Sequence, residues 1–171
     1  MSQEANLAPN LSVMGSSEGK GIVVSVRVVD ERPTKSLGFR SGGYGKGAEI
    51  KSTQDVAIVI QEAIISGLRS KGFDTSDWNM ESDPRLNVEV RFLEYTTSTG
   101  LWTGGVHVNA AIKIEATNGG EVYEKIYRSE NEKRVVIVPG ATSNEKQINL
   151  VLSDVLNRIF DDQALMNHLA Q

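Results

Sequence analysis

Apolar residues recur at helical spacing in two long stretches of the chain. Over residues 52–71 and 142–160 they fall at intervals of three and four, which places them on one stripe of a helix. Ser52 and Thr142 are the expected N-caps, because an acidic residue follows each of them three residues later, as in a capping box. An internal duplication would also explain the shared offsets, but helical periodicity is weak evidence for it. We predict two amphipathic helices, packed side by side.

Alternation of apolar and polar residues predicts four strands. Residues 21–29, 85–95 and 106–116 alternate with a period of two, and a turn with the sequence NGG then leads into a return strand over residues 121–128. Residues 134–139 predict a further short edge strand, and a final short helix is expected to be capped by an aspartate pair. The main order is therefore strand, helix, strand, strand, strand, helix.

This order predicts the α+β class. The crossover through the first helix predicts a parallel pair, and the later strands predict an antiparallel meander. We expect a two-layer sandwich with both long helices on one face of a mixed, mainly antiparallel sheet, and a polar, solvated opposite face.

The alternation also predicts which strand residues face the core. In the strand 85–95, four residues are expected to face inward: Leu86, Val88, Val90 and Phe92. The return strand leaves two alternatives open, with either Val122 and Ile126 or Tyr123 and Tyr127 facing the core.

The length of 171 residues fits one domain. Residues 1–20 are polar and rich in Ser, Asn and Gly, which predicts a flexible N-terminal tether, and residues 21–171 are expected to form a single α+β domain. Local packing by Leu7, Leu11 and Val13 is the less favoured alternative for the first segment.

Composition narrows the classes of function. The net charge is −4 and the sequence holds no Lys/Arg cluster, which argues against nucleic acid as a partner. The 171 residues contain no cysteine, so they form no disulfide, thiolate metal site or Cys nucleophile. The apolar runs fall short of the roughly 20 residues of a membrane span. Because the N-terminus also lacks a signal-peptide pattern, either the protein is cytosolic or a leader has been removed.

The sequence offers no clear catalytic or metal-binding cluster. His107 and His168 lie on different predicted elements, and neither has a neighbour at ligand spacing. A Ser-His-Asp triad assembles in space and stays an alternative, but the chain has no G-x-S-x-G elbow. We therefore expect no catalytic residue, no metal site, no cofactor and no enzymatic activity.

Two loops hold the candidate binding residues. The glycine-rich segment 37–49 does not match a phosphate-binding loop, so a solvated loop is the main interpretation. A binding loop using Arg40, Tyr44 and Lys46 is the alternative, and Trp102 is a candidate in the loop that follows the strand 85–95.

A separate candidate lies on the first helix. Ile58 and Ile65 are seven residues apart and off the main apolar stripe. Cover by a loop or by the last helix is the favoured interpretation. The alternative is an exposed patch that meets a partner, a second copy of the chain included.

Several motifs resemble the YajG-like family of uncharacterised bacterial lipoproteins. They are VVSVRVVDERPTKSLG, a helix ending in LRSKGF, the strand LNVEVRFLEY, the NGG turn and the terminal helix pair. The likeness spans roughly residues 20–169. Its most specific pieces are Asp30-x-Arg32 followed by Leu37-Gly38, and the pair Gly72-Phe73.

This resemblance implies export, lipidation on an N-terminal cysteine, and an outer-membrane location facing the periplasm. It brings no catalytic residues. The chain has no such cysteine, so Met1-Ser2 would stand in place of the leader and the lipid-bearing residue. A cytoplasmic protein is the alternative.

The leading hypothesis is a non-catalytic binding or adaptor module of the cell envelope. Its partner would be another envelope protein or a cell-wall component, and it would meet the membrane only through the lipid. The alternative is a protein that binds a small ligand or a cell-wall glycan through Trp78, Trp102 and Tyr44. A hydrolase with an unrecognised site is the third hypothesis.

Overall fold

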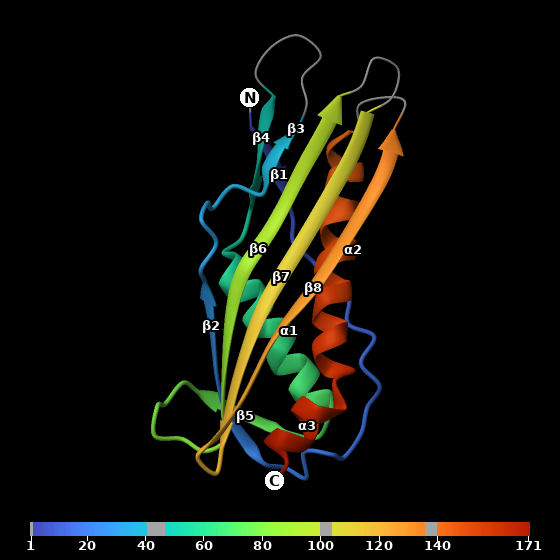
Figure 1. Cartoon of the computed structure of the whole chain (residues 1–171). Helices are drawn as coiled ribbons and strands as arrows, with labels where there is room; N and C mark the ends of the chain where they lie inside the picture. The colour runs from blue at the N-terminus through green and yellow to red at the C-terminus, as the bar shows by residue number, and fades with distance from the viewer. Residues whose placement is uncertain (1, 41–46, 100–103, 136–139) are drawn as a thin grey trace.

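The computed structural model describes residues 2–40, 47–99, 104–135 and 140–171, and within these ranges the chain has an α+β fold (Figure 1). In chain order the elements are β1 (Gln3–Ala5), β2 (Val23–Asp30), β3 (Gly38–Arg40), β4 (Ala48–Ser52), α1 (Val56–Ser70), β5 (Asp74–Asp77), β6 (Arg85–Thr99), β7 (Gly104–Asn118), β8 (Glu121–Val135), α2 (Ala141–Phe160) and α3 (Gln163–Leu169). The predicted α+β class is confirmed. None of the helices in the described ranges has the length and apolar character needed to cross a membrane.

The sheet is organised around β6. β2 pairs in parallel with the first half of β6, and β3 meets the same strand further along, at Tyr95. β7 pairs antiparallel with β6, and β8 pairs antiparallel with β7. Two more parallel pairs, β1 with β4 and β2 with β5, extend the sheet. The sheet is therefore mixed, and the prediction that it is mainly antiparallel is wrong.

Four of the strands lie outside the predicted order. β1, β3, β4 and β5 are between 3 and 5 residues long. A strand of this length shows too few alternations for a period of two to stand out from its surroundings. These strands form by pairing with one another or with β2 and β6, which is a property of the assembled sheet.

The N-caps of the two long helices differ from the prediction. Asp55, and not Ser52, caps α1, and its carboxylate accepts hydrogen bonds from the N–H groups of Ala57 and Ile58. Ser52 instead ends β4. Gly140 is the N-cap of α2, without a side-chain hydrogen bond, so Thr142 lies inside the first turn. Ser and Thr are favoured in turns as well as at N-caps, so the capping-box pattern alone does not fix where a helix begins. Here β4 extends through Ser52, the residue that the capping box would use.

A β-bulge at Arg91 changes which residues of β6 face the core. The register with β7 shifts between Val90 and Phe92. An extra residue on one strand reverses the side-chain alternation beyond it. Leu93 and Tyr95 are accordingly buried, whereas Phe92 is 39% exposed on the opposite face. The prediction that Phe92 faces inward is wrong, while Leu86, Val88 and Val90 are buried as expected.

β8 is one long strand, and its aromatic side chains face the helices. Tyr127 is buried and Tyr123 is partly buried, whereas Val122 and Ile126 are exposed. Of the two alternatives, the structure therefore adopts the tyrosine face. The strand continues without a break to Val135. The rest of the predicted edge strand, residues 136–139, lies outside the described residues.

The N-terminal segment, predicted as a tether, packs on the domain. β1 pairs with β4, and Ala5 and Leu7 are buried. Beyond β1, four backbone N–H groups donate to side chains of α2: Asn6 to Glu145, Ala8 to Asn149, Asn10 to Ser153, and Ser12 to Asn157. Two extended residues advance about 6.6 Å and four helical residues about 6 Å, so the two repeats stay in step. We call this series the N-terminal ladder.

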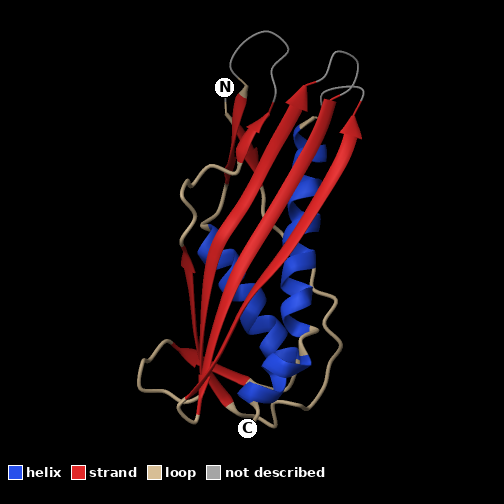
Figure 2. Cartoon of the chain, viewed as in Figure 1, coloured by secondary structure: helices blue, strands red, loops and turns tan. Residues whose placement is uncertain are grey.

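The helices lie together on one face of the sheet (Figure 2). α1 packs against β2, and α2 packs against β7 and β8. Between the helices and the sheet lies a core of buried aliphatic side chains, such as Val26, Ile64, Ile112 and Leu152. The opposite, outer face of β6, β7 and β8 carries no helix in the described part of the chain, and there the polar residues of the strands meet solvent.

Candidate functional site

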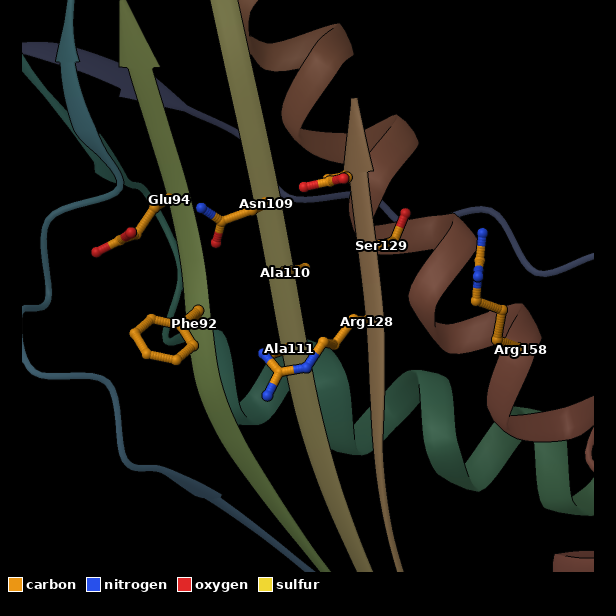
Figure 3. Close-up of a pocket in the computed structure, with 9 residues that line it drawn as sticks. Phe92, Glu94, Asn109, Ala110, Ala111, Arg128, Ser129 and Arg158 are labelled. Atoms are coloured by element: carbon orange, nitrogen blue, oxygen red, sulfur yellow. The ribbon is translucent and has the colours of Figure 1, made fainter. Parts of the chain in front are cut away.

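A pocket of about 600 Å³ opens on the outer face of the sheet beside the bulge (Figure 3). Its lining comes from three strands and one helix: Phe92 and Glu94 of β6, Asn109, Ala110 and Ala111 of β7, Arg128, Ser129 and Glu130 of β8, and Arg158 of α2. We call this the outer-face pocket.

The strand register explains why there is a hollow. Phe92 lies opposite Ala111, and Ala111 lies opposite Arg128, so a small residue sits between two large ones in one row. Neighbouring side chains in such a row are near enough to form a continuous surface. Ala111 is buried, and in Figure 3 the side chain of Arg128 extends over it toward Phe92. The bulge is essential, because without it Phe92 would point into the core.

Charged residues surround the apolar floor. Glu94, Asn109 and Glu130 form the next row across the three strands. His107 Nε2 lies 3.5 Å from Glu130 Oε2. Two acidic and two basic side chains, Arg128 and Arg158 included, therefore share the lining without a strong net charge. Such a surface suits a ligand that combines an apolar group with polar or charged groups of both signs.

The rim of the pocket at β8 is tied to α2. Ser129 Oγ donates to Asp154 Oδ2 at 2.6 Å, and Arg158 Nε donates to the same oxygen at 2.8 Å. These hydrogen bonds lower the pKa of the Asp154 carboxyl, the one from Ser129 most strongly. Asp154 is therefore a carboxylate at neutral pH. The Ser129 hydroxyl hydrogen-bonds to a carboxylate and not to a histidine base, so this contact is structural.

No metal-binding cluster is found within the described ranges. There, no group of three or more His, Cys, Asp or Glu side chains could hold a metal ion. His168 Nε2 lies 3.1 Å from the carbonyl oxygen of Ala116, which gives that buried histidine a structural partner.

Of the candidate binding residues from the sequence, Arg40 and Trp78 lie in the described ranges. Arg40 belongs to β3, away from the outer-face pocket, and Tyr44, Lys46 and Trp102 lie outside the described residues. Trp78 is partly buried, and the guanidinium carbon of Arg27 lies 4.3 Å from the centre of its ring, so one ring face is occupied. Neither Arg40 nor Trp78 lines the outer-face pocket.

The two isoleucines of α1 differ in exposure. Ile58 is 60% exposed, so the favoured interpretation, that a loop or helix covers it, does not hold in the described part of the chain. Ile65 is partly buried and lines a shallow hollow with Glu62 and Arg69. A partner at this patch stays a prediction.

The motif Asp30-x-Arg32 forms a second polar site. Arg32 Nε and Nη2 donate to the two carboxylate oxygens of Asp30, at 2.8 and 2.9 Å. Burial alone would raise the pKa of Asp30, but hydrogen bonds from Arg32 and Lys35 outweigh it and lower the pKa to about 2. The pair borders a cleft of about 760 Å³ beside β4 and the start of α1. Lys35 Nζ pairs with the same carboxylate at 3.0 Å, and the buried Arg32 Nη1 has no hydrogen-bond partner among the described residues.

Sequence reasoning missed the outer-face pocket. Phe92 was expected in the core, and nothing in the sequence links it to Ala111 or Arg128. A signal was nevertheless present, because Phe92 and Leu93 are adjacent apolar residues in a strand. Two apolar neighbours in an alternating strand are compatible with a bulge.

The family of the chain comes from one comparison with known proteins, and its fold from another. A family model described as "Uncharacterized lipoprotein" matches residues 9–170. A comparison with curated proteins gives no significant match. Among solved structures, the crystal structure of an uncharacterised protein superposes with a TM-score of 0.53 at 14% identity, covering 96% of this chain and 97% of the other. This likeness shows the shared fold.

Two further solved structures are more distant. The hypothetical protein CT253 from Chlamydia trachomatis has a TM-score of 0.48 at 10% identity, covering 87% of this chain and 98% of that one. Lipoprotein GNA1162 from Neisseria meningitidis has a TM-score of 0.38 at 12% identity, covering 83% and 99%. Neither adds to what the first structure shows of the fold.

Proposed function

The chain belongs to the YajG-like family of uncharacterised lipoproteins, and we propose that it is the periplasm-facing domain of an outer-membrane lipoprotein with a non-catalytic binding or adaptor role. The family description, an uncharacterised lipoprotein, supports the lipid anchor. The outer-face pocket is the observation that carries the binding role, because it joins an aromatic ring, a small floor residue and charges of both signs.

Binding fits this site better than catalysis. The pocket is lined by strand residues whose positions the register fixes, so it is formed before any ligand arrives. A preformed hollow with a few polar groups is typical of a recognition site. Its serine is engaged with Asp154, and a general base beside a free nucleophile is not found among the lining residues.

The chemistry of the pocket favours a peptide-like partner. Phe92 offers an apolar surface, Arg128 a donor fork for carboxylates, and Glu94 and Glu130 acceptors for ammonium or amide groups. A segment of another envelope protein, or the peptide part of a cell-wall component, carries all three types of group. The proposed partner is therefore of that class.

The location is tested with the complete reading frame expressed in its own host. We expect incorporation of labelled palmitate, recovery in the outer-membrane fraction, and digestion by protease only after the outer membrane is opened. Replacing the expected lipid-bearing cysteine should release the protein. A reading frame without a leader and cysteine would return the protein to the cytosol.

The binding role is tested by NMR titration of the labelled domain with peptidoglycan fragments that carry their stem peptides. We expect the amide signals of Ala111 and Arg128 to shift, and Phe92→Ser to abolish the shifts. The exposed residue Val122, also on a strand of the outer face, provides the control Val122→Ser. Absence of any shift at the pocket would contradict this ligand class.

The same titration addresses the alternative that loop aromatics bind a glycan. The chain has two tryptophans, Trp78 and Trp102, each with one indole N–H signal. Shifts confined to these indole signals would favour the glycan binder over the outer-face pocket. Shifts at Ala111 with unmoved indole signals would favour the pocket.

A further inference from the structure

We propose that the cleft beside β2, β4 and the start of α1 binds an oxyanion, the carboxylate or phosphate group of a small molecule, through Arg32 and Lys35. We call it the Arg32 cleft. Its volume is about 760 Å³, and it shares no lining residue with the outer-face pocket. The proposal is therefore independent of the partner proposed for that pocket.

The segment between β2 and β3 presents the two cationic side chains. At its start, the N–H of Glu31 donates to the carbonyl oxygen of Val90 at 3.1 Å. At its end, the N–H of Leu37 donates to the carbonyl oxygen of Ile50 at 2.8 Å. The segment is thus held to the sheet at both ends, so the site exists before any ligand arrives.

One nitrogen of the Arg32 guanidinium lacks an acceptor. Nε and Nη2 donate to the two carboxylate oxygens of Asp30, at 2.8 and 2.9 Å. The remaining corner of the planar group, Nη1, is buried and has no hydrogen-bond partner in the described ranges. Arg32 lines the cleft although it is only 7% exposed. A buried donor without an acceptor is unfavourable, so an acceptor that enters the cleft is stabilised there.

The same cluster carries an excess of positive charge. Asp30 is a carboxylate at neutral pH, because hydrogen bonds from Arg32 and Lys35 outweigh the effect of burial and lower its pKa to about 2. Lys35 Nζ lies 3.0 Å from Asp30 Oδ2. Two cations therefore share one carboxylate, and this excess favours an anion over a neutral acceptor.

The other acidic side chains that line the cleft have partners of their own. Glu49 Oε2 lies 3.2 Å from Lys51 Nζ. The carboxylate of Asp55 accepts the N–H groups of Ala57 and Ile58 at the start of α1. This end of the helix is already capped, so the proposal does not depend on it. The donor that stays without a partner is Arg32 Nη1.

Two hydroxyl groups add further donors to the cleft. Thr34 Oγ1 accepts the N–H of Ser36 at 3.2 Å, and Ser52 Oγ accepts the N–H of Gln54 at 3.1 Å. Each hydroxyl keeps its own proton for donation. Both Thr34 and Ser52 line the cleft. A guanidinium corner, an ammonium group and hydroxyls are the donors that bind carboxylate and phosphate oxygens.

Lys35 gives an anion access to the buried nitrogen. Its side chain is 72% exposed, against 3% for that of Arg32. An exposed ion pair is weak, so the ammonium group can turn from Asp30 toward an arriving oxyanion. The oxyanion then bridges Lys35 Nζ and Arg32 Nη1. Asp30 is not left unpaired, because Arg32 still donates to both of its oxygens.

The site is tested by NMR titration of the labelled protein with inorganic phosphate and, separately, with acetate. Sodium chloride of equal ionic strength is the reference. We expect phosphate, acetate or both to give saturable shifts of the Arg32 Nε–H signal and of the Lys35 amide, beyond any change in chloride. The anion that saturates at the lower concentration identifies the preferred group. Absence of a saturable shift at Arg32 with both anions would overturn the proposal.

A pair of variants separates the site from general attraction between charges. Lys35→Gln removes the excess charge at an exposed position, and Lys146→Gln removes an exposed lysine of α2. We expect the dissociation constant of the preferred anion to rise several-fold in Lys35→Gln and to stay unchanged in Lys146→Gln. Equal effects of the two substitutions would mean unspecific binding and contradict the site.

Arg32→Lys tests the guanidinium itself, because lysine keeps the charge but lacks the planar group of donors. We expect the saturable shift at Lys35 to be lost, and an unchanged affinity would contradict the role of Nη1. Cross-relaxation between the Nη1 hydrogens and water in the unaltered protein gives an answer even if this variant does not fold. Contact with a bound water that persists at saturating anion would show that water is the partner of Nη1. Loss of that contact on addition of the anion supports the proposal.

Discussion

Gly67 of α1 lies directly against the ring of Phe160 of α2. A Cβ atom at position 67 would come within 2.2 Å of the ring carbon Cζ, which is closer than real contacts allow. The absence of a side chain therefore lets the two helices approach, and the fully buried ring fills the space between them. The apolar stripe of α1 predicts that Gly67 faces inward, but the close approach depends on α2.

This contact predicts a specific destabilisation. Gly67→Ala should lower the free energy of unfolding by about 1–3 kcal/mol, because overpacking forces the helices apart. Urea unfolding followed by circular dichroism measures the change. The exposed neighbour Ser66→Ala is the control and should be nearly neutral. Adding Phe160→Leu to Gly67→Ala should make the glycine substitution less costly than it is in the native background.

The bulge predicts unequal losses of stability for substitutions at two adjacent residues. Leu93→Ala should cost about 2–5 kcal/mol, as expected when a fully buried leucine leaves a cavity. Phe92→Ala should cost much less despite the larger side chain, because Phe92 lies on the outer face. Chemical denaturation of the two variants measures both. A larger cost for Phe92→Ala would mean that β6 lacks the bulge.

Asp162 predicts a loss of stability in acid. Burial raises its pKa, but hydrogen bonds from Lys125, Tyr127 and Tyr123 outweigh this and lower it to about 2, from 3.8. A lowered pKa in the folded state means that the stabilisation is complete above the unfolded value and is lost as the pH falls toward 2. We therefore expect the free energy of unfolding to decrease between about pH 4 and pH 2.

Substitution identifies the group responsible for this pH dependence. Asp162→Asn should lower stability at pH 7 and flatten the acid dependence, because the amide does not titrate. Asp161→Asn, at the exposed neighbouring position, should change neither. Asp30, whose pKa is also about 2, contributes a similar dependence, so part of the slope should remain in Asp162→Asn. An unchanged slope in that variant would contradict the assignment.

The N-terminal ladder predicts local protection from hydrogen exchange. Asn149 accepts from the N–H of Ala8 and donates to the carbonyl oxygen of Asn6. Asn149→Ala should speed amide exchange over residues 6–12 and cost about 1–2 kcal/mol, since it removes two hydrogen bonds. Lys146→Ala, at an exposed position on the same helix, is the control. Rapid exchange of residues 6–12 in the unaltered protein would show that the segment is a tether after all.

Part of the fold follows from local pattern. Both long helices, the strands β2 and β7, and the aspartate cap of α3 were predicted, because each depends on residues within a few positions of one another. The side-chain period of a helix or strand is set by the backbone itself. The family resemblance rests on the same local motifs, and the family model confirms it.

The candidate site depends on contacts that sequence order conceals. Phe92, Ala111 and Arg128 come together only through the register of three strands, and a single extra residue at the bulge decides the face on which Phe92 lies. The N-terminal ladder joins Asn6 to Glu145, which is 139 positions away. Local periodicity carries no information about such pairs.

The sequence alone therefore determined which segments are helix or long strand, and which family the chain belongs to. The tertiary structure decided where the short strands form and which residues of β6 face the core beyond the bulge. It also decided how the N-terminal segment docks and where the outer-face pocket lies. The physical reason is that an isolated segment already has its own period, whereas register and edge pairing exist only once neighbouring segments have chosen their alignment.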